Sequence, residues 1–166
     1  MAANKKRAFD GLYAQLEEVN NHVVLFAAKG EPSVIFEMTN PVQQLCTDAE
    51  QYLRFQDVLS NIVQTLGEGY ALQKQDVFCK QSYHHEVPED AEFLTRSYFR
   101  YFEGREFTEI RTFLILTQEA QRSQFVQYDP KKWLDFHAKV NKVSDILSEK
   151  HIRHRMLSKE EVNEYC

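Results

Sequence analysis

Two long segments of the chain carry apolar residues at steps of three and four, the spacing that gathers side chains on one face of an α-helix. In the first segment these residues are Tyr52, Phe55, Leu59, Ile62 and Leu66. In the second they are Trp133, Phe136, Val140, Val143 and Leu147. The first predicted helix begins after Thr47 or Asp48 and ends at Gly67 or Gly69, and the second begins at Asp129-Pro130.

Short apolar runs predict the strands. Residues 23–28 and 33–39 are two such runs, and Gly30 and Pro32 lie at the turn between them, so we expect a β-hairpin. Residues 9–19, by contrast, give only a weak indication of one or more helical turns.

Two longer strands are predicted further along the chain. Residues 70–78 are polar in the middle, which is typical of an edge strand, whereas 108–117 are apolar enough to be central. A last short strand is expected over residues 151–157. Residues 79–88 and 119–128 are polar and are expected to form loops.

Two further helices complete the pattern. The first is expected from Asp90 as N-cap to near Gly104, and its apolar residues are Phe93, Leu94, Tyr98, Tyr101 and Phe102. A terminal helix is expected from Ser158, where Ser158-Lys159-Glu160-Glu161 resembles a capping box.

Strands and helices interleave without strict alternation, in the approximate order β-β-α-β-α-β-α. This order favours an α+β fold, a two-layer sandwich with helices on one face of a mainly antiparallel sheet. We expect a flexible N-terminus at residues 1–8, followed by a single domain over residues 9–166 that is the N-terminal part of a longer protein.

Composition narrows the function classes. The chain has 166 residues, 43% of them hydrophobic, and a formal net charge of −5, which is ordinary globular composition. Its 5 glycines include none followed by Lys and no Gly-x-Gly-x-x-Gly or Gly-x-Ser-x-Gly pattern, so the common nucleotide-binding loops and the nucleophile elbow are missing. We therefore expect no enzyme activity and no cofactor.

The cysteines and histidines do not form a recognisable chemical site. Cys46, Cys79 and Cys166 are odd in number and far apart, which favours a reducing compartment. Cys79, His84, His85 and Glu86 lie close in sequence, but zinc prefers four ligands at regular spacing, and no Cys-x-x-Cys occurs. A Cys79–His84 nucleophile pair lacks a third group to orient it. We predict no catalytic or metal-binding residue, and expect His137 to flank the core.

Basic and aromatic residues suggest an alternative. Arg96, Arg100 and Arg105 lie on or just beyond a predicted helix among several aromatics, a mixture that also suits nucleic acid. The net charge of −5 argues against this use. A second basic cluster spans 150–155. Among the aromatic residues, the candidates for exposure at an interface are Phe99, Phe125 and Tyr128.

Four stretches of the chain resemble a known family. They are GEPSVIFEMTNP (30–41), NIVQTLGEGYALQKQDVF (61–78), FLTRSYF (93–99) and FLILT (113–117). Together they resemble the N-terminal region of TraG-type conjugation ATPases of Bacteroides conjugative transposons, which are relatives of the type IV secretion ATPases. The resemblance extends over about residues 17–165, nearly the whole chain.

The resemblance implies a longer parent protein, whose N-terminal domain docks to a membrane-embedded channel and whose C-terminal motor hydrolyses ATP. No ATPase residue carries over, because the Walker motifs are absent here. The expected role is a non-catalytic assembly domain for DNA transfer, cytoplasmic and peripheral at the inner membrane in the parent complex. Its expected partners are channel proteins, with a second copy of the chain as a further candidate and nucleic acid not expected.

Overall fold

The structure, a computed structural model, describes residues 13–19, 22–27, 30–40, 48–88, 90–119 and 129–165. The described strands are β1 (Tyr13–Val19), β2 (His22–Ala27), β3 (Pro32–Met38), β4 (Tyr70–Ser82), β5 (Glu106–Gln118) and β6 (His154–Met156). The described helices are α2 (Ala49–Leu66), α3 (Phe93–Phe102), α4 (Pro130–Glu149) and α5 (Lys159–Tyr165). The predictions for residues 1–8, Thr47, Phe125 and Tyr128 lie outside these ranges.

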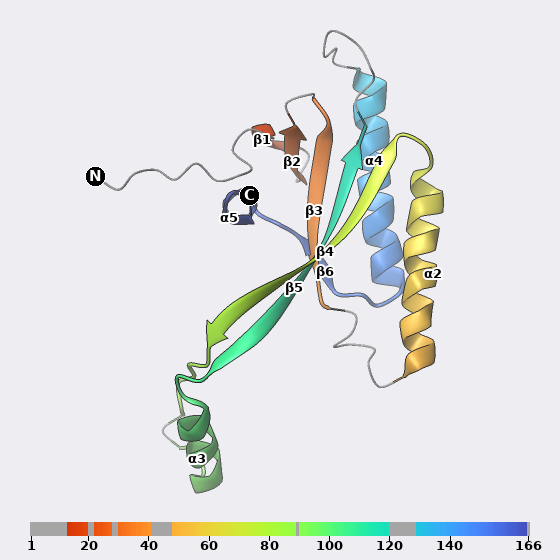
Figure 1. The fold of residues 1–166 in the computed structure, drawn as a ribbon. Helices are drawn as coiled ribbons and strands as arrows, with labels where there is room; N and C mark the ends of the chain where they lie inside the picture. The colour runs from red at the N-terminus through yellow and green to blue at the C-terminus, as the bar shows by residue number, and fades with distance from the viewer. Residues whose placement is uncertain are drawn as a thin grey trace, which may run out of the picture. The chain divides into compact units, whose positions relative to one another are not determined.

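The six described strands form one sheet with the order β1-β2-β3-β5-β4 (Figure 1). The pairs β1–β2, β2–β3, β3–β5 and β3–β6 are antiparallel, and β2 and β6 contact β3 at different residues along it. The predicted α+β fold with an antiparallel sheet is therefore confirmed. The strand order also confirms that β5 is a central strand, between β3 and β4, and that β4 is an edge strand.

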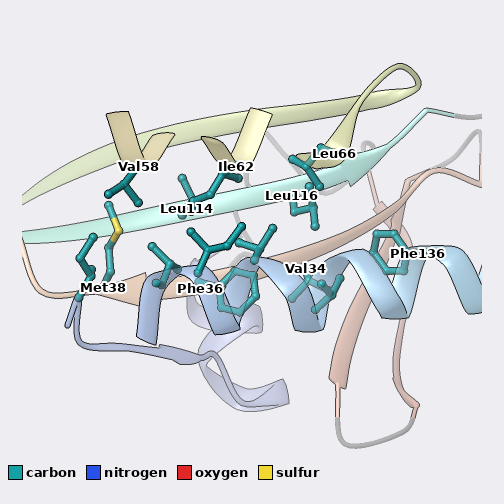
Figure 2. Packing of buried hydrophobic residues seen from close by; sticks show 14 of the residues in the cluster. Val34, Phe36, Met38, Val58, Ile62, Leu66, Leu114, Leu116 and Phe136 are labelled. Atoms are coloured by element: carbon teal, nitrogen blue, oxygen red, sulfur yellow. The ribbon is translucent and has the colours of Figure 1, made fainter. Parts of the chain in front are cut away.

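The main hydrophobic core lies between one face of the sheet and the two long helices. Alternate residues of β3 and β5 enter it, including Phe36 opposite Leu114 and Val34 opposite Leu116 in the antiparallel register. Apolar residues of α2 and α4 pack against these strand residues, as Figure 2 shows for Ile62 of α2 and Phe136 of α4. Successive side chains of a strand lie on opposite faces of the sheet, so the alternate residues of β3 and β5 that contact α2 and α4 all lie on one face. Both helices therefore cover the same face.

The opposite face of the sheet is contacted by the short C-terminal helix. Phe113, whose neighbour Leu114 belongs to the main core, packs against the ring of Tyr165 with centroids 4.7 Å apart. Val162 of α5 is also buried. The two long helices thus share one face, as predicted, and α5 adds a contact on the other.

Three helix starts follow from local side-chain chemistry. Asp48 accepts a hydrogen bond from the Glu50 amide at 2.9 Å, and Asp129 accepts one from the Lys131 amide at 3.0 Å. Before α5, Ser158 and Glu161 bond each other's backbone amides at 3.3 and 2.9 Å. These caps confirm the predicted starts of α2, α4 and α5.

Contacts within the chain group into two compact units. Unit 1 is Met1–Gln75 with Thr112–Cys166, and unit 2 is Asp76–Arg111. The boundary falls within β4 and β5, which run through both units. The single domain expected over residues 9–166 stays a prediction.

Two sequence predictions about strands are corrected. Residues 13–19 are strand β1, and the weak helical indication there is wrong, because this segment pairs antiparallel with β2, with one register shift between Tyr13 and Gln15. β4 continues to Ser82, four residues beyond its predicted end at Phe78. Its polar end is held across to β5, since Lys80 Nζ donates to Glu106 Oε2 at 3.5 Å and Gln81 Nε2 donates to Glu109 Oε2 at 3.4 Å.

The start of α3 also differs from the prediction. The N-cap residue is Glu92 rather than Asp90, and its side chain makes no capping hydrogen bond. The helix ends before Gly104, as predicted, and this glycine has a φ of 71°, a conformation that favours a residue without Cβ.

Candidate docking surface

In unit 2, α3 lies in the chain segment that connects the end of β4 to the start of β5. Two backbone hydrogen bonds close the base of this insertion, from the Tyr83 amide to the Arg105 carbonyl and from the Gly104 amide to the Tyr83 carbonyl, both at 2.9 Å. They fix the two chain segments that enter and leave the helix. The helix is therefore positioned by backbone pairing as well as by side-chain packing.

The inner face of α3 packs on aromatic rings from the segment after β4. Phe99 contacts His85 and Tyr83 with ring centroids 4.5 and 6.5 Å apart, and Phe102 contacts Tyr83 at 6.1 Å. Phe99 and Phe102 are half-buried. Phe99, a candidate for exposure at an interface, is thus only partly exposed, because its ring belongs to this small aromatic cluster.

The outer face of α3, defined by Phe93, Leu94, Ser97, Tyr98 and Tyr101, is open to solvent. Phe93 is 81% exposed and Leu94 77%, and both tyrosines are exposed as well. No residue of α3 is buried. Removing an apolar side chain of this size from water is worth about 1.5–3 kcal/mol, so this face retains a strong tendency to bind an apolar surface.

Charged residues lie along α3 and at both of its ends. Asp90 and Glu92 precede its first turn, whereas Arg100 lies in its last turn and Arg105 just beyond it. The Arg105 guanidinium stacks 3.6 Å from the centre of the Tyr101 ring. Arg96 lies in the first turn and Glu103 directly follows the last, so charges of both signs are found at both ends of α3.

The three arginines singled out for nucleic acid lie in the same unit. Arg96 and Arg100 are one turn apart on α3, and Arg96 Nε donates to the Ala91 carbonyl at 2.8 Å. Yet residues 76–111 contain more acidic than basic residues. The arrangement brings the predicted residues together without giving the unit a positive charge.

The residues considered for metal or nucleophilic chemistry have other partners. His84 Nδ1 donates to Glu103 Oε1 at 2.6 Å, and this hydrogen bond lowers the pKa of the Glu103 carboxyl. His85 packs edge-to-face on Phe99, and Cys79 lies in β4. In the described parts of the chain, no group of three or more His, Cys, Asp and Glu residues is placed to hold a metal ion. The expected absence of catalytic, cofactor and metal residues stays a prediction.

A buried histidine pair joins β2 to α4 in unit 1. The Nδ1 atoms of His22 and His137 lie 2.8 Å apart, so one of them is protonated and donates a hydrogen bond to the other. Burial lowers the pKa of both imidazoles, and the neighbouring His22 charge lowers that of His137 further. His137 is buried beside the core residue Phe136, which agrees with its predicted place at the flank of the core.

One residue of the second basic cluster, Arg155, has a structural role. Arg155 of β6 forms ion pairs with Glu37 of β3 and Glu161 of α5, the latter at 2.7 Å. The hydrogen bond from Arg155 lowers the pKa of Glu161 to about 2. This network ties α5 to the sheet and leaves Arg155 already engaged by two carboxylates.

Among the described residues, no helix is both long and apolar enough to cross a membrane. Comparisons with models of known protein families and with curated proteins give no match.

The outer face of α3 is the functional feature that the sequence pattern missed. The sequence pattern predicts Phe93, Leu94, Tyr98 and Tyr101 as apolar residues of a helix, like those of α2 and α4, and the two tyrosines also as aromatics interleaved with arginines. One signal was available: α3 is short, with ten residues, and places apolar residues on both sides of the helix. Such a helix has more apolar surface than one packing layer covers.

Proposed function

We propose that this chain is a non-catalytic docking domain in a conjugative-transfer machine, the N-terminal part of a TraG-type ATPase that binds protein components of the membrane channel during DNA transfer. The four stretches that resemble this family support the assignment to a transfer machine. In the parent complex the domain would be cytoplasmic and peripheral at the inner membrane, held there by its protein partners.

The exposed outer face of α3 is the observation that carries the docking role. Phe93 and Leu94 are 81% and 77% exposed on a helix that buries no residue. Contiguous exposed apolar side chains with charged residues at their ends are typical of protein interfaces. A domain whose work is assembly has a physical reason to keep such a face open until its partner arrives.

The experiment is co-purification with the channel proteins encoded beside the chain on its mobile element. Native protein is compared with a Phe93→Ser/Leu94→Ser variant, which changes two side chains of α3 that are 81% and 77% exposed, and with Leu134→Ser on α4, where Leu134 is 66% exposed in unit 1. We expect recovery of channel proteins to fall at least about tenfold in the α3 variant and to stay unchanged in the control.

Two outcomes would contradict the proposal. If the native chain recovers no channel protein, the docking role is wrong, and if it hydrolyses ATP above the buffer background, the non-catalytic assignment is wrong. Recovery that is equal in all three proteins would remove the outer face of α3 from the assembly.

Nucleic-acid binding is the second candidate, favoured by Arg96, Arg100 and Arg105 lying in one unit beside exposed tyrosines. Such binding would weaken steeply with salt, because phosphate contacts release counterions. A titration with single-stranded DNA at several salt concentrations tests it, and no binding at low salt would exclude it.

A further inference from the structure

The hairpin of β1 and β2 contacts α4 through two rings on the same face of β2. His22 and Phe26 are four residues apart, so their side chains lie on the same side of the strand. His22 bonds His137, and the Phe26 ring stacks on that of Trp133 with centroids 5.7 Å apart. Between them, Val24 enters the main core. The hairpin is thus attached to α4 at two separate points, one near each end of β2.

Of these two points, the one at Phe26 is also supported by a neighbouring strand. β2 pairs with β3 at Leu25 and Phe26. Further along the chain, β3 pairs with β6 instead, over residues 36–38. Among the described strands, His22 pairs with β1 alone. Its bond to His137 therefore anchors the end of the hairpin that β3 does not hold.

The side chain of Asn141 determines which histidine donates. Burial lowers the pKa of the His22 imidazole, whereas its hydrogen bond with Asn141 raises it, and a bond with this effect is one that the imidazole donates. Nδ1 of His22 faces His137, so the atom that donates to Asn141 is Nε2, which carries the single proton of the neutral ring. His22 Nδ1 is then an acceptor, and His137 Nδ1 donates to it.

A further proton has no favourable place in this arrangement. Nε2 of His137 is buried and has no hydrogen-bond partner among the described residues, so a cationic N–H there would be an unpaired donor. A proton on Nδ1 of His22 would instead place two N–H groups face to face across 2.8 Å. Protonation at either atom therefore opposes the closed contact.

The charged groups around the pair have other partners. On α4, Asp135 accepts a hydrogen bond from a tyrosine of β4, and Lys139 donates to carbonyls at the end of α2. On β1, Glu17 lies on the same face of the sheet as His22, but it is exposed and accepts a hydrogen bond from Gln15. The β3 residues that pair with β2 are uncharged. The charge that lowers the pKa of His137 is that of His22 itself.

We propose that proton uptake by the His22–His137 pair separates the His22 end of the β1–β2 hairpin from α4, while the rest of unit 1 stays folded. The hairpin is then a pH-sensitive element, closed when both imidazoles are neutral. Burial holds the pKa of both imidazoles below 6.5, so the closed form is favoured above pH 6.5 and loses stability as the pH falls below it. This inference is independent of the docking role of α3.

Hydrogen exchange of the full chain at pH 7.5 and pH 5.5, corrected for intrinsic exchange rates, tests the opening. We expect the β1 and β2 amides next to His22 to lose protection at least about fivefold at pH 5.5, because a two-stranded hairpin without its anchor is marginally stable. The amides of α2 should keep their protection. Unchanged protection of the hairpin would overturn the inference, and so would an equal loss in α2, which would mean that the whole of unit 1 opens.

Two variants assign the effect to the pair. His22→Leu/His137→Leu cannot take up the protons, so its hairpin protection should change by less than about twofold between the two pH values. His151→Asn is the matched control, because His151 is an exposed histidine of unit 1, and it should behave like the native chain. A fivefold loss that persists in the double variant would contradict the proposal.

Trp133 gives a second readout that does not depend on the double variant folding. It is the only tryptophan of the chain, and its ring centroid lies 4.6 Å from that of His137. We expect its fluorescence to change with a midpoint below pH 6.5 in the native chain and in His151→Asn, while far-UV circular dichroism stays constant. Constant fluorescence from pH 7.5 to pH 5 would show that the pair stays closed and would overturn the inference.

Discussion

The two units use helices with apolar stripes in opposite ways. In unit 1, the stripes of α2 and α4 are buried against the sheet, with Ile62 and Phe136 fully inaccessible to solvent. In unit 2, α3 carries as many large apolar side chains for its length, yet none of its residues is buried. Periodicity therefore shows which residues share a face, while burial depends on whether another element is present to cover it.

The largest difference between the units should appear when the same substitution is made in each. Phe136→Ala in α4 removes a fully buried ring and is expected to lower the free energy of unfolding by about 3–5 kcal/mol. Phe93→Ala in α3 is the matched control and should change it by less than about 0.5 kcal/mol, because its ring is already in water.

Urea unfolding of the two variants measures both values. A large loss of stability in the Phe93 variant would mean that α3 is covered in the isolated chain, which would break the comparison between the units.

Unit 1 should also lose stability in mild acid through its histidine pair. Burial lowers the folded-state pKa of His22 and His137 below the ordinary value of 6.5, so the folded protein binds fewer protons than the unfolded chain. The contribution of the two neutral histidines to the free energy of unfolding is complete above pH 6.5. It is lost as the pH falls below 6.5, by at most about 1.4 kcal/mol per pH unit for each histidine.

Thermal unfolding between pH 8 and pH 5 measures this slope, and a His22→Leu/His137→Leu double variant supplies the comparison. The double variant should show a flatter profile over the same range. Equal slopes in the two proteins would mean that the buried pair does not control the acid sensitivity.

The aromatic cluster of unit 2 should be a local support for α3. Phe99→Ala removes the ring that contacts His85 at 4.5 Å and Tyr83 at 6.5 Å, and we expect α3 to be destabilised by about 1–2 kcal/mol. Hydrogen exchange measures this as faster exchange of the α3 amides, with the amides of α4 unchanged. Equal acceleration in both helices would show that the cluster supports the whole chain rather than unit 2.

The sequence predicted the parts of the fold that local chemistry determines. The stripes and caps of α2 and α4 and the capping box of α5 are all readable from residue type and spacing. The sequence did not predict strand β1, because its pairing with β2 overrides a weak local pattern. It also did not predict the end of β4, where polar side chains form hydrogen bonds across to β5. The docking face was hidden for a related reason: the spacing of Leu94 and Tyr98 is the same whether a partner covers them or not.

The smallest expected effect concerns the ion pairs that hold α5, the helix of unit 1 that most resembles α3 in length. Arg155 is half-exposed and binds Glu37 and Glu161, so Arg155→Gln should cost only about 1 kcal/mol after screening by solvent. Arg54→Gln is the matched control, because Arg54 makes a single exposed pair with Glu50 at 3.8 Å, and it should have no measurable effect.

The acid profile separates this network from the rest of unit 1. The hydrogen bond from Arg155 lowers the folded-state pKa of Glu161 from 4.5 to about 2, so its contribution is present above pH 4.5 and is lost as the pH falls toward 2. Arg155→Gln should flatten the stability profile in that window alone, and urea unfolding at pH 3 and pH 6 measures it. An unchanged profile would mean that α5 is held by Val162 and Tyr165 through packing, which is the kind of support that the outer face of α3 lacks.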